Sequence, residues 1–169
     1  MPIIRKKLIK LKNKKTMLFF KQKAFKSHLF TEQDFYKRFI LDLNECQREI
    51  IIESPYITSY RIGLFMPIFS KLLDKRIQIH IVTRDPIDHD EYFRDQATNG
   101  ILACNEMGIN IVMLKNNHHR KLAIIDRKIL WEGSLNILSY NRSQEVMRRI
   151  EGEDFAQEMI DFLNLDKFV

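Results

Sequence analysis

The stretch HRKLAIID, residues 119–126, and the tetrapeptide GSLN, residues 133–136, decide the fold and the chemistry of this 169-residue chain. Lys121 stands two residues after His119, and alternate residues of a β-strand point to the same face. The apolar run after Lys121 predicts a strand, followed by a turn at residues 126–128 and a returning strand. The pattern therefore brings together a nucleophile, a cation and two neutral hydrogen-bond donors, which are the groups needed to attack a phosphodiester.

These residues resemble the HxKxxxxD…GSxN motif of the phospholipase D superfamily, which includes lipases, phosphatidyl transferases and endonucleases. The similarity extends from about Glu49 to Gly152. Residues 50–56 and 79–84 read like the first two core strands of the family, and residues 121–134 resemble the motif hairpin of its nuclease-like branch. The resemblance implies a phospholipase D-like α/β fold and catalysis without a metal ion.

Four side chains carry the expected reaction. His119 is the candidate nucleophile, because an imidazole can attack phosphorus and carry a phosphohistidine intermediate. Lys121 would offset the charge that gathers on the non-bridging oxygens, to which Ser134 and Asn136 would also donate. Outside this motif, the histidine would be a hydrogen-bonded strand residue, and Ser134 and Asn136 would form the N-cap of a following helix.

Four further residues are placed by the motif or by their position. The motif includes Asp126, which we count with the catalytic set but expect to support the turn rather than transfer protons. Glu145 lies where relatives carry a carboxylate that orients the histidine. His118 should point away from His119, and Arg84, which ends a core strand, would contact either phosphate or a turn carboxylate. We predict neither a metal site nor a cofactor, since Lys121 already supplies the central positive charge.

The motif occurs once. No other histidine of the chain is followed two residues later by lysine. Relatives bring two motifs together, so that one histidine attacks while the other protonates the leaving oxygen. We therefore expect a homodimer with one composite active site across a two-fold axis.

The positive charge is concentrated at the amino end. The formal net charge is +6, yet residues 1–30 contain ten Lys and Arg and no acidic residue. We divide the chain into a basic arm, residues 1–30, either helical or disordered, and a catalytic domain, residues 31–169. The arm would contact nucleic acid or, as an amphipathic helix, an anionic membrane; a solvated tail or linker is the third alternative.

The remaining composition is that of an intracellular enzyme. Hydrophobic residues make up 45% of the chain and charged residues 30%. Cys46 and Cys104 lack metal-ligand spacing and predict buried thiols in a reducing compartment. No apolar run reaches the roughly 18 residues of a membrane span. We expect a cytoplasmic location.

The pattern of the domain alternates helices with strands. Apolar periodicity predicts helices over residues 31–46, 60–75, 91–108 and 154–163, with a kink or a later start at Pro67 in the second. Strands are predicted over residues 49–53, 76–83, 109–114 and 145–150, besides the motif hairpin. The fold class is therefore α/β, a mixed, largely parallel β-sheet flanked by helices.

Three functions agree with this sequence. The first is a metal-independent endonuclease that hydrolyses DNA or RNA, favoured by the basic arm. The second is a phospholipid phosphodiesterase, favoured by the superfamily and an amphipathic arm. The third is a nucleic-acid-binding or dimerisation module of a helicase or restriction system with little activity of its own. Of the partners, nucleic acid and a second copy of the chain are expected more than a membrane.

Overall fold

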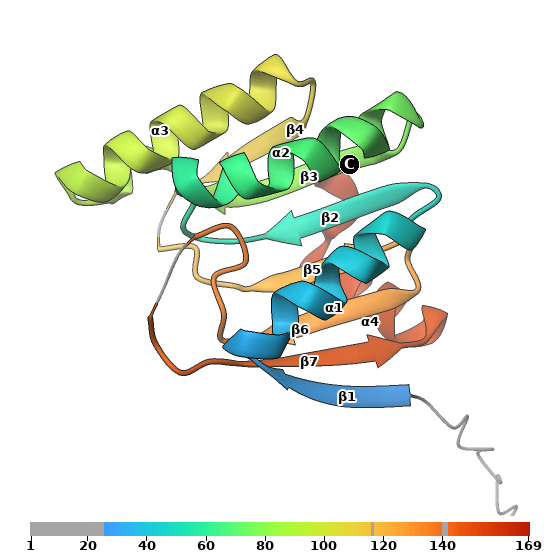
Figure 1. Cartoon of the computed structure of the whole chain (residues 1–169). Helices are drawn as coiled ribbons and strands as arrows, with labels where there is room; N and C mark the ends of the chain where they lie inside the picture. Colours follow the sequence, from blue (N-terminus) through green and yellow to red (C-terminus); the bar gives the residue numbers. More distant parts are fainter. Residues whose placement is uncertain (1–25, 116, 140–141) are drawn as a thin grey trace, which may run out of the picture.

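A seven-stranded sheet forms the frame of the computed structural model, which describes residues 26–115, 117–139 and 142–169. The sheet has the order β1-β7-β6-β5-β2-β3-β4 (Figure 1). The strands are β1 (Lys26–Thr31), β2 (Glu49–Glu53), β3 (Gln78–Arg84), β4 (Asn110–Leu114), β5 (Leu122–Ile125), β6 (Ile129–Gly133) and β7 (Val146–Glu151). The predicted motif hairpin is present as β5 and β6, and β5 is the central strand of the sheet.

The direction of the strands changes at the centre of the sheet. β2, β3 and β4 run parallel, whereas β2–β5, β5–β6, β6–β7 and β7–β1 are antiparallel pairs. The mixed α/β sheet is therefore confirmed, but the parallel part is smaller than expected. The reason is local, since β5, β6 and β7 follow one another without a crossover helix, which a parallel pair requires.

Helices cover the two faces unequally. The helices are α1 (Glu32–Glu45), α2 (Ser59–Asp74), α3 (Glu91–Glu106) and α4 (Glu153–Leu163), with short 3₁₀ turns η1 (Pro86–Asp88) and η2 (Leu165–Phe168). The larger core lies on the face of α1, α2 and α3 and includes Phe35, Phe69 and Trp131. The smaller core lies under α4 and includes Ile124 and Ile160. Only α4 and η2 cover the second face in the described part of the chain (Figure 1).

Two sequence predictions need correction. β1, residues 26–31, belongs to the sheet, so the last residues of the predicted basic arm are part of the domain; the rest of the arm, residues 1–25, lies outside the described residues. α2 continues through Pro67 without beginning anew there. Pro67 is exposed, and an exposed helix face can lose a backbone hydrogen bond to water at lower cost than a buried one.

A buried carboxylate, Asp42, ties α1 to strands β6 and β7 of the sheet. Asp42 is fully buried and accepts hydrogen bonds from Arg149 at 2.8 and 3.0 Å and from Trp131 at 2.9 Å. Arg38 donates to the same carboxylate at 2.6 Å. The bonds fix α1 relative to β6 and β7, the two strands that flank the loop carrying Ser134 and Glu145.

Candidate active site

The segment that carries the nucleophile crosses the carboxyl ends of the parallel strands. Residues 117–121 lead from β4, at one edge of the sheet, to β5 at its centre, and so pass the ends of β3 and β2. Lys121 Nζ lies 3.0 Å from His119 Nδ1 and 3.3 Å from its Nε2, and donates to the His119 carbonyl oxygen at 2.7 Å. The structure thus brings the imidazole and the ammonium group within reach of one phosphate group.

A pocket of about 560 Å³ opens beside these two side chains. His119, Arg120 and Lys121 line it, and Arg148 of β7 lines it beside its cross-strand partner Glu132 of β6. The rest of the lining is mainly apolar and includes Leu29, Val146, Met159, Phe162 and Leu163. The pocket therefore joins a cationic end, suited to a phosphate, to an apolar wall.

Ser134 and Asn136 follow the end of β6. Ser134 Oγ accepts from the Val146 backbone N–H at 3.1 Å, and the Ser134 N–H donates to the Val146 carbonyl at 3.0 Å. The side chain therefore fixes the start of β7 while its hydroxyl stays exposed. Asn136 Oδ1 is buried and has no hydrogen-bond partner among the described residues. A buried acceptor without a partner is costly, and a ligand lowers that cost only by donating a hydrogen bond to it; the Nδ2 group is the part of Asn136 that can donate to phosphate oxygens.

Glu145 and Ser134 line a separate pocket of about 510 Å³, beside Thr31 and Glu32. Its carboxylate accepts from Ser143 Oγ, and its backbone N–H donates to Glu32 Oε2 at 3.0 Å. Burial lowers the pKa of Lys121, and the negative charge of Glu145 opposes that shift. Glu145 therefore acts electrostatically on the ammonium group of Lys121.

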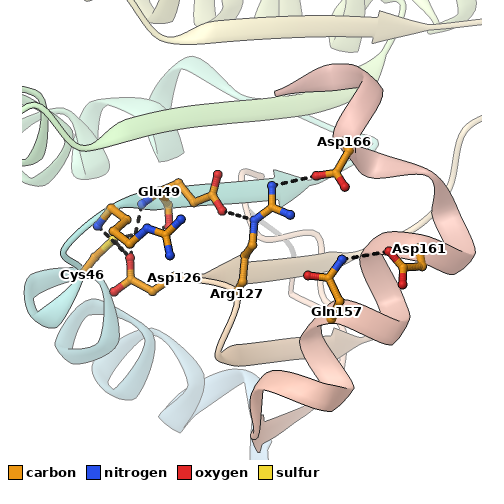
Figure 2. Close-up of polar contacts among 8 residues, drawn as sticks. Cys46, Glu49, Asp126, Arg127, Gln157, Asp161 and Asp166 are labelled. Atoms are coloured by element: carbon orange, nitrogen blue, oxygen red, sulfur yellow. Dashed lines mark hydrogen bonds and ion pairs between the residues drawn. The ribbon is translucent and has the colours of Figure 1, made fainter.

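Asp126 lies at the end of β5 opposite to Lys121, and the four residues of this strand span roughly 13 Å. Its carboxylate accepts from the backbone N–H groups of Gln47 at 2.9 Å, Arg48 at 2.8 Å and Glu49 at 3.2 Å, and from Cys46 Sγ at 3.2 Å (Figure 2). The residue thus ties the β5–β6 turn to the start of β2. This geometry agrees with the supporting role and not with a place in the catalytic set.

Two other candidates take part in packing around the segment. His118 is buried, and burial lowers its pKa, while the charge of Glu53 raises it in part. Arg84 Nη2 donates to the Asp88 carbonyl at 2.6 Å and to Asn117 Oδ1 at 3.1 Å. Arg84 therefore holds the segment that precedes His119, a role that neither of its sequence alternatives foresaw.

With this geometry, the family can be assigned. A family model described as a cardiolipin synthase, PLD-like domain, matches residues 39–166. The chain belongs to the phospholipase D superfamily. The match contains the whole hairpin, the Ser134 loop and α4.

Solved structures show the same fold. NucT from Helicobacter pylori has a TM-score of 0.64 at 20% identity, covering 86% of this chain and 96% of NucT. Nuc from Salmonella typhimurium, described as a phospholipase D family member, has a TM-score of 0.66 at 14% identity, covering 82% of this chain and 91% of Nuc. A phosphatidylserine synthase from Haemophilus influenzae has a TM-score of 0.66 at 10% identity, covering 85% of this chain and 38% of the synthase. No curated protein matches the chain by sequence.

One ion pair at this phospholipase D-like site, between Arg120 and Glu53, was not predicted from the sequence. Arg120, between His119 and Lys121, donates from Nε at 2.6 Å and from Nη2 at 2.8 Å to the carboxylate of Glu53. The available signal was Glu53 itself, a carboxylate at the end of an apolar strand, because buried charges require a partner. The identity of that partner depends on the pairing of β2 with β5.

Among residues 26–115, 117–139 and 142–169, no group of three or more His, Cys, Asp or Glu could hold a metal ion. None of the helices that these residues form combines the length and the apolar character of a membrane span. Cys46 and Cys104 are buried free thiols, and burial raises the pKa of Cys46 to about 12 and that of Cys104 to about 11.

Proposed function

We propose that this phospholipase D-like protein is an endonuclease that hydrolyses DNA or RNA without a metal ion. The contact between His119 and Lys121 at the cationic end of an exposed pocket carries the proposal. A nitrogen of His119 attacks phosphorus, the N–P bond forms and the P–O bond of the leaving strand breaks. Water then attacks the phosphohistidine, and the N–P bond breaks. Lys121 and Asn136 stabilise the charge on the non-bridging oxygens in both steps.

The leaving oxygen requires a proton, and we assign this proton to His119 of a second copy of the chain. The motif occurs once per chain, so one copy lacks a second histidine of this kind. Three apolar side chains around the mouth of the pocket support such an assembly: Leu29 is 63% exposed, Val146 49% and Phe162 83%. Exposed apolar groups gathered in one place are typical of protein interfaces. The composite site thus requires a homodimer.

Nucleic acid is the favoured substrate because of charge. Residues 1–30 carry ten Lys and Arg without an acidic residue. Polyanions bind such segments by releasing counterions. Among proteins with the same fold, TrmBL2 is described as an archaeal chromatin protein with a novel mode of DNA binding; it has a TM-score of 0.55 at 13% identity and covers 80% of this chain and 50% of TrmBL2.

Cleavage of plasmid and single-stranded oligonucleotides in the presence of EDTA tests the activity. We expect the wild-type protein to cleave and His119→Ala to lose at least about 10⁴-fold in kcat, as removal of a nucleophile does elsewhere. His28→Ala, on β1, is the matched control and should retain full activity. Full cleavage by His119→Ala would refute the assignment.

Mixing of subunits tests the composite site. Wild-type and His119→Ala chains are unfolded together in equal amounts and refolded, so that random pairing leaves two intact histidines in a quarter of the dimers. A shared site predicts activity falling to that fraction, whereas independent sites predict half. A fully active monomer, measured by sedimentation at the assay concentration, contradicts the dimer.

The apolar wall of the pocket favours a second candidate, a phospholipid phosphodiesterase. Met159, Phe162 and Leu163 of α4 would contact acyl chains while the head-group phosphate meets Lys121. Release of head groups from anionic vesicles, with nucleic acid left intact, would decide for this function. Phe162→Asp distinguishes the two functions. If Phe162 lies in the dimer contact of a nuclease, the variant should dissociate into monomers. If Phe162 contacts acyl chains, the variant should keep its assembly and lose vesicle hydrolysis. Leu102→Asp, on exposed α3, is the control.

A further inference from the structure

The carboxylate at the end of β2 is buried beneath the segment that carries the nucleophile. The Glu53 side chain is fully buried, whereas the Arg120 side chain is 42% exposed. The two are joined by parallel hydrogen bonds of 2.6 and 2.8 Å from Nε and Nη2 to separate carboxylate oxygens. Such a bidentate pair fixes the plane and direction of the guanidinium group, which a single contact does not.

Arg120 stands in the sequence between His119 and Lys121, and all three residues line the cationic end of the pocket. Its head group is held by Glu53, while the side chains on either side of it meet each other at 3.0 Å. A rotation of the backbone at Arg120 would move both of these side chains together.

Residues 117–121 need a side-chain anchor because they precede β5 and lie outside its ladder pairing. β5 begins at Leu122, which pairs with Glu53 on one side and Glu132 on the other. Residues 117–121 have no regular secondary structure; one backbone hydrogen bond, from the Gly133 N–H to the Lys121 carbonyl at 3.3 Å, joins them to β6, and side chains add further connections. Arg84 holds Asn117 at the far end of the segment, and Glu53 holds Arg120 next to the nucleophile.

Stability alone is a poor reason for this arrangement. Removing two charges from water costs about as much as their attraction returns, and well-packed apolar residues often serve equally well or better. What the pair supplies that apolar residues do not is direction. The bidentate geometry is therefore better explained by orientation than by folding energy.

We propose that Glu53 and Arg120 are positioning residues: the bidentate pair anchors the segment to the end of β2 and so sets the orientation of His119 and Lys121 toward phosphate. The proposal rests on the phosphodiesterase function proposed above. Neither side chain reacts with substrate.

The decisive variant is Arg120→Lys, which keeps the positive charge and loses the second hydrogen bond. The chain offers a matched control at the other end of β2, where Arg127 Nε donates to Glu49 at 2.5 Å. Arg127→Lys makes the same substitution at an arginine that bonds two carboxylates, Glu49 and Asp166, away from the residues that line the pocket. Both variants are compared with wild type by steady-state cleavage of bis(p-nitrophenyl) phosphate and by NMR of the histidine ring nitrogens.

We expect Arg120→Lys to lower kcat by about 10- to 100-fold with KM within about threefold, because misplacement of reacting groups affects the chemical step. The His119 ring signals should shift or broaden in the same variant. Arg127→Lys should change neither. Ring signals and kcat in Arg120→Lys equal to those in Arg127→Lys would overturn the proposal.

A second set of variants excludes loss of folding as the cause. Glu53→Met and Arg120→Met each leave one buried or desolvated charge unpaired and should lower the melting temperature, whereas the double variant removes both charges. Positioning predicts that the double variant regains the melting temperature but not kcat. Recovery of both would show that the pair only maintains the fold. A wild-type protein without activity would refute the proposed function, and the NMR comparison alone would then decide on positioning.

Discussion

The two ends of β5 carry opposite halves of one sequence motif. At the amino end, His119 and Lys121 contact each other at 3.0 Å and line an open pocket. At the carboxyl end, the Asp126 carboxylate accepts three backbone N–H groups and the Cys46 thiol (Figure 2). One end leaves hydrogen-bonding capacity for a ligand, and the other uses it within the protein.

The difference shows that residues of a single motif can serve separate purposes. Groups that must meet a substrate stay accessible and contribute little to folding, because water satisfies them in either state. A carboxylate that collects several backbone donors contributes to folding and has no capacity left for chemistry. The four predictions below test this division, starting with the largest effect.

Replacing Lys121 should affect catalysis alone. We expect Lys121→Met to lower kcat by about 10²- to 10³-fold, since it removes a positive charge from the non-bridging oxygens of the transition state. The melting temperature should stay within about 2 °C of wild type, because Lys121 is only half-buried and methionine keeps the apolar part of its side chain. Lys128→Met, in the β5–β6 turn, is the exposed control. Unchanged cleavage by Lys121→Met would contradict the assignment.

Replacing Asp126 should affect folding alone. Asp126→Ala leaves three backbone donors without their acceptor, and we expect the free energy of unfolding to fall by about 1–3 kcal/mol. Activity per folded molecule should stay within about tenfold of wild type. Urea titrations with parallel assays measure both quantities. A severe loss of activity in a fully folded Asp126→Ala protein would return this residue to the catalytic set.

The pH dependence of the stability that Asp126 contributes follows from the pKa of its carboxyl group. Burial would raise this pKa, but hydrogen bonds from Gln47, Cys46, Arg48 and Glu49 together hold it below the ordinary value of 3.8. The carboxylate therefore stabilises the fold fully above that value, and the contribution disappears as pH falls through the lower pKa of the folded state. Wild type and Asp126→Ala should converge in stability under strongly acidic conditions.

Glu145 should give the smallest effect, a shift in the pH profile. Its charge raises the pKa of Lys121 against the lowering caused by burial. Glu145→Gln removes the opposing charge, so Lys121 loses its proton at a lower pH. The alkaline limb of kcat/KM should accordingly move to lower pH. An unmoved limb would mean that Lys121 does not set it.

Much of the fold could be predicted because local patterns determine it. Apolar residues in β2 and in the motif hairpin predicted strands that agree with the structure to within a residue or two. β1 was missed because Lys26, Ser27 and His28 are typical of a solvated segment, and their strand depends on pairing with β7. The antiparallel part of the sheet was underestimated because the sequence does not show which strands are neighbours.

In the site, too, contacts between residues close in the sequence could be predicted, and contacts between distant residues could not. The contact between His119 and Lys121 follows from a spacing of two residues on an extended segment. Glu53 and Arg120 are 67 residues apart, and only the pairing of β2 with β5 brings them together. The apolar wall of the pocket was not predicted, since it is assembled from β1, β7 and α4.

The pairing of β1 with β7 joins the first and last described strands of the sheet, and this has a consequence for the order of folding. Glu32, directly after β1, holds the backbone of Glu145 across 113 residues of chain. Closing so long a loop is among the slowest steps available to a chain, because its entropy is lost before the contact forms. The central hairpin can form early, whereas the loop that bears Glu145 reaches its place only when both ends of the domain have met. Recovery of activity on refolding should therefore follow the slowest phase, after most of the sheet has already formed.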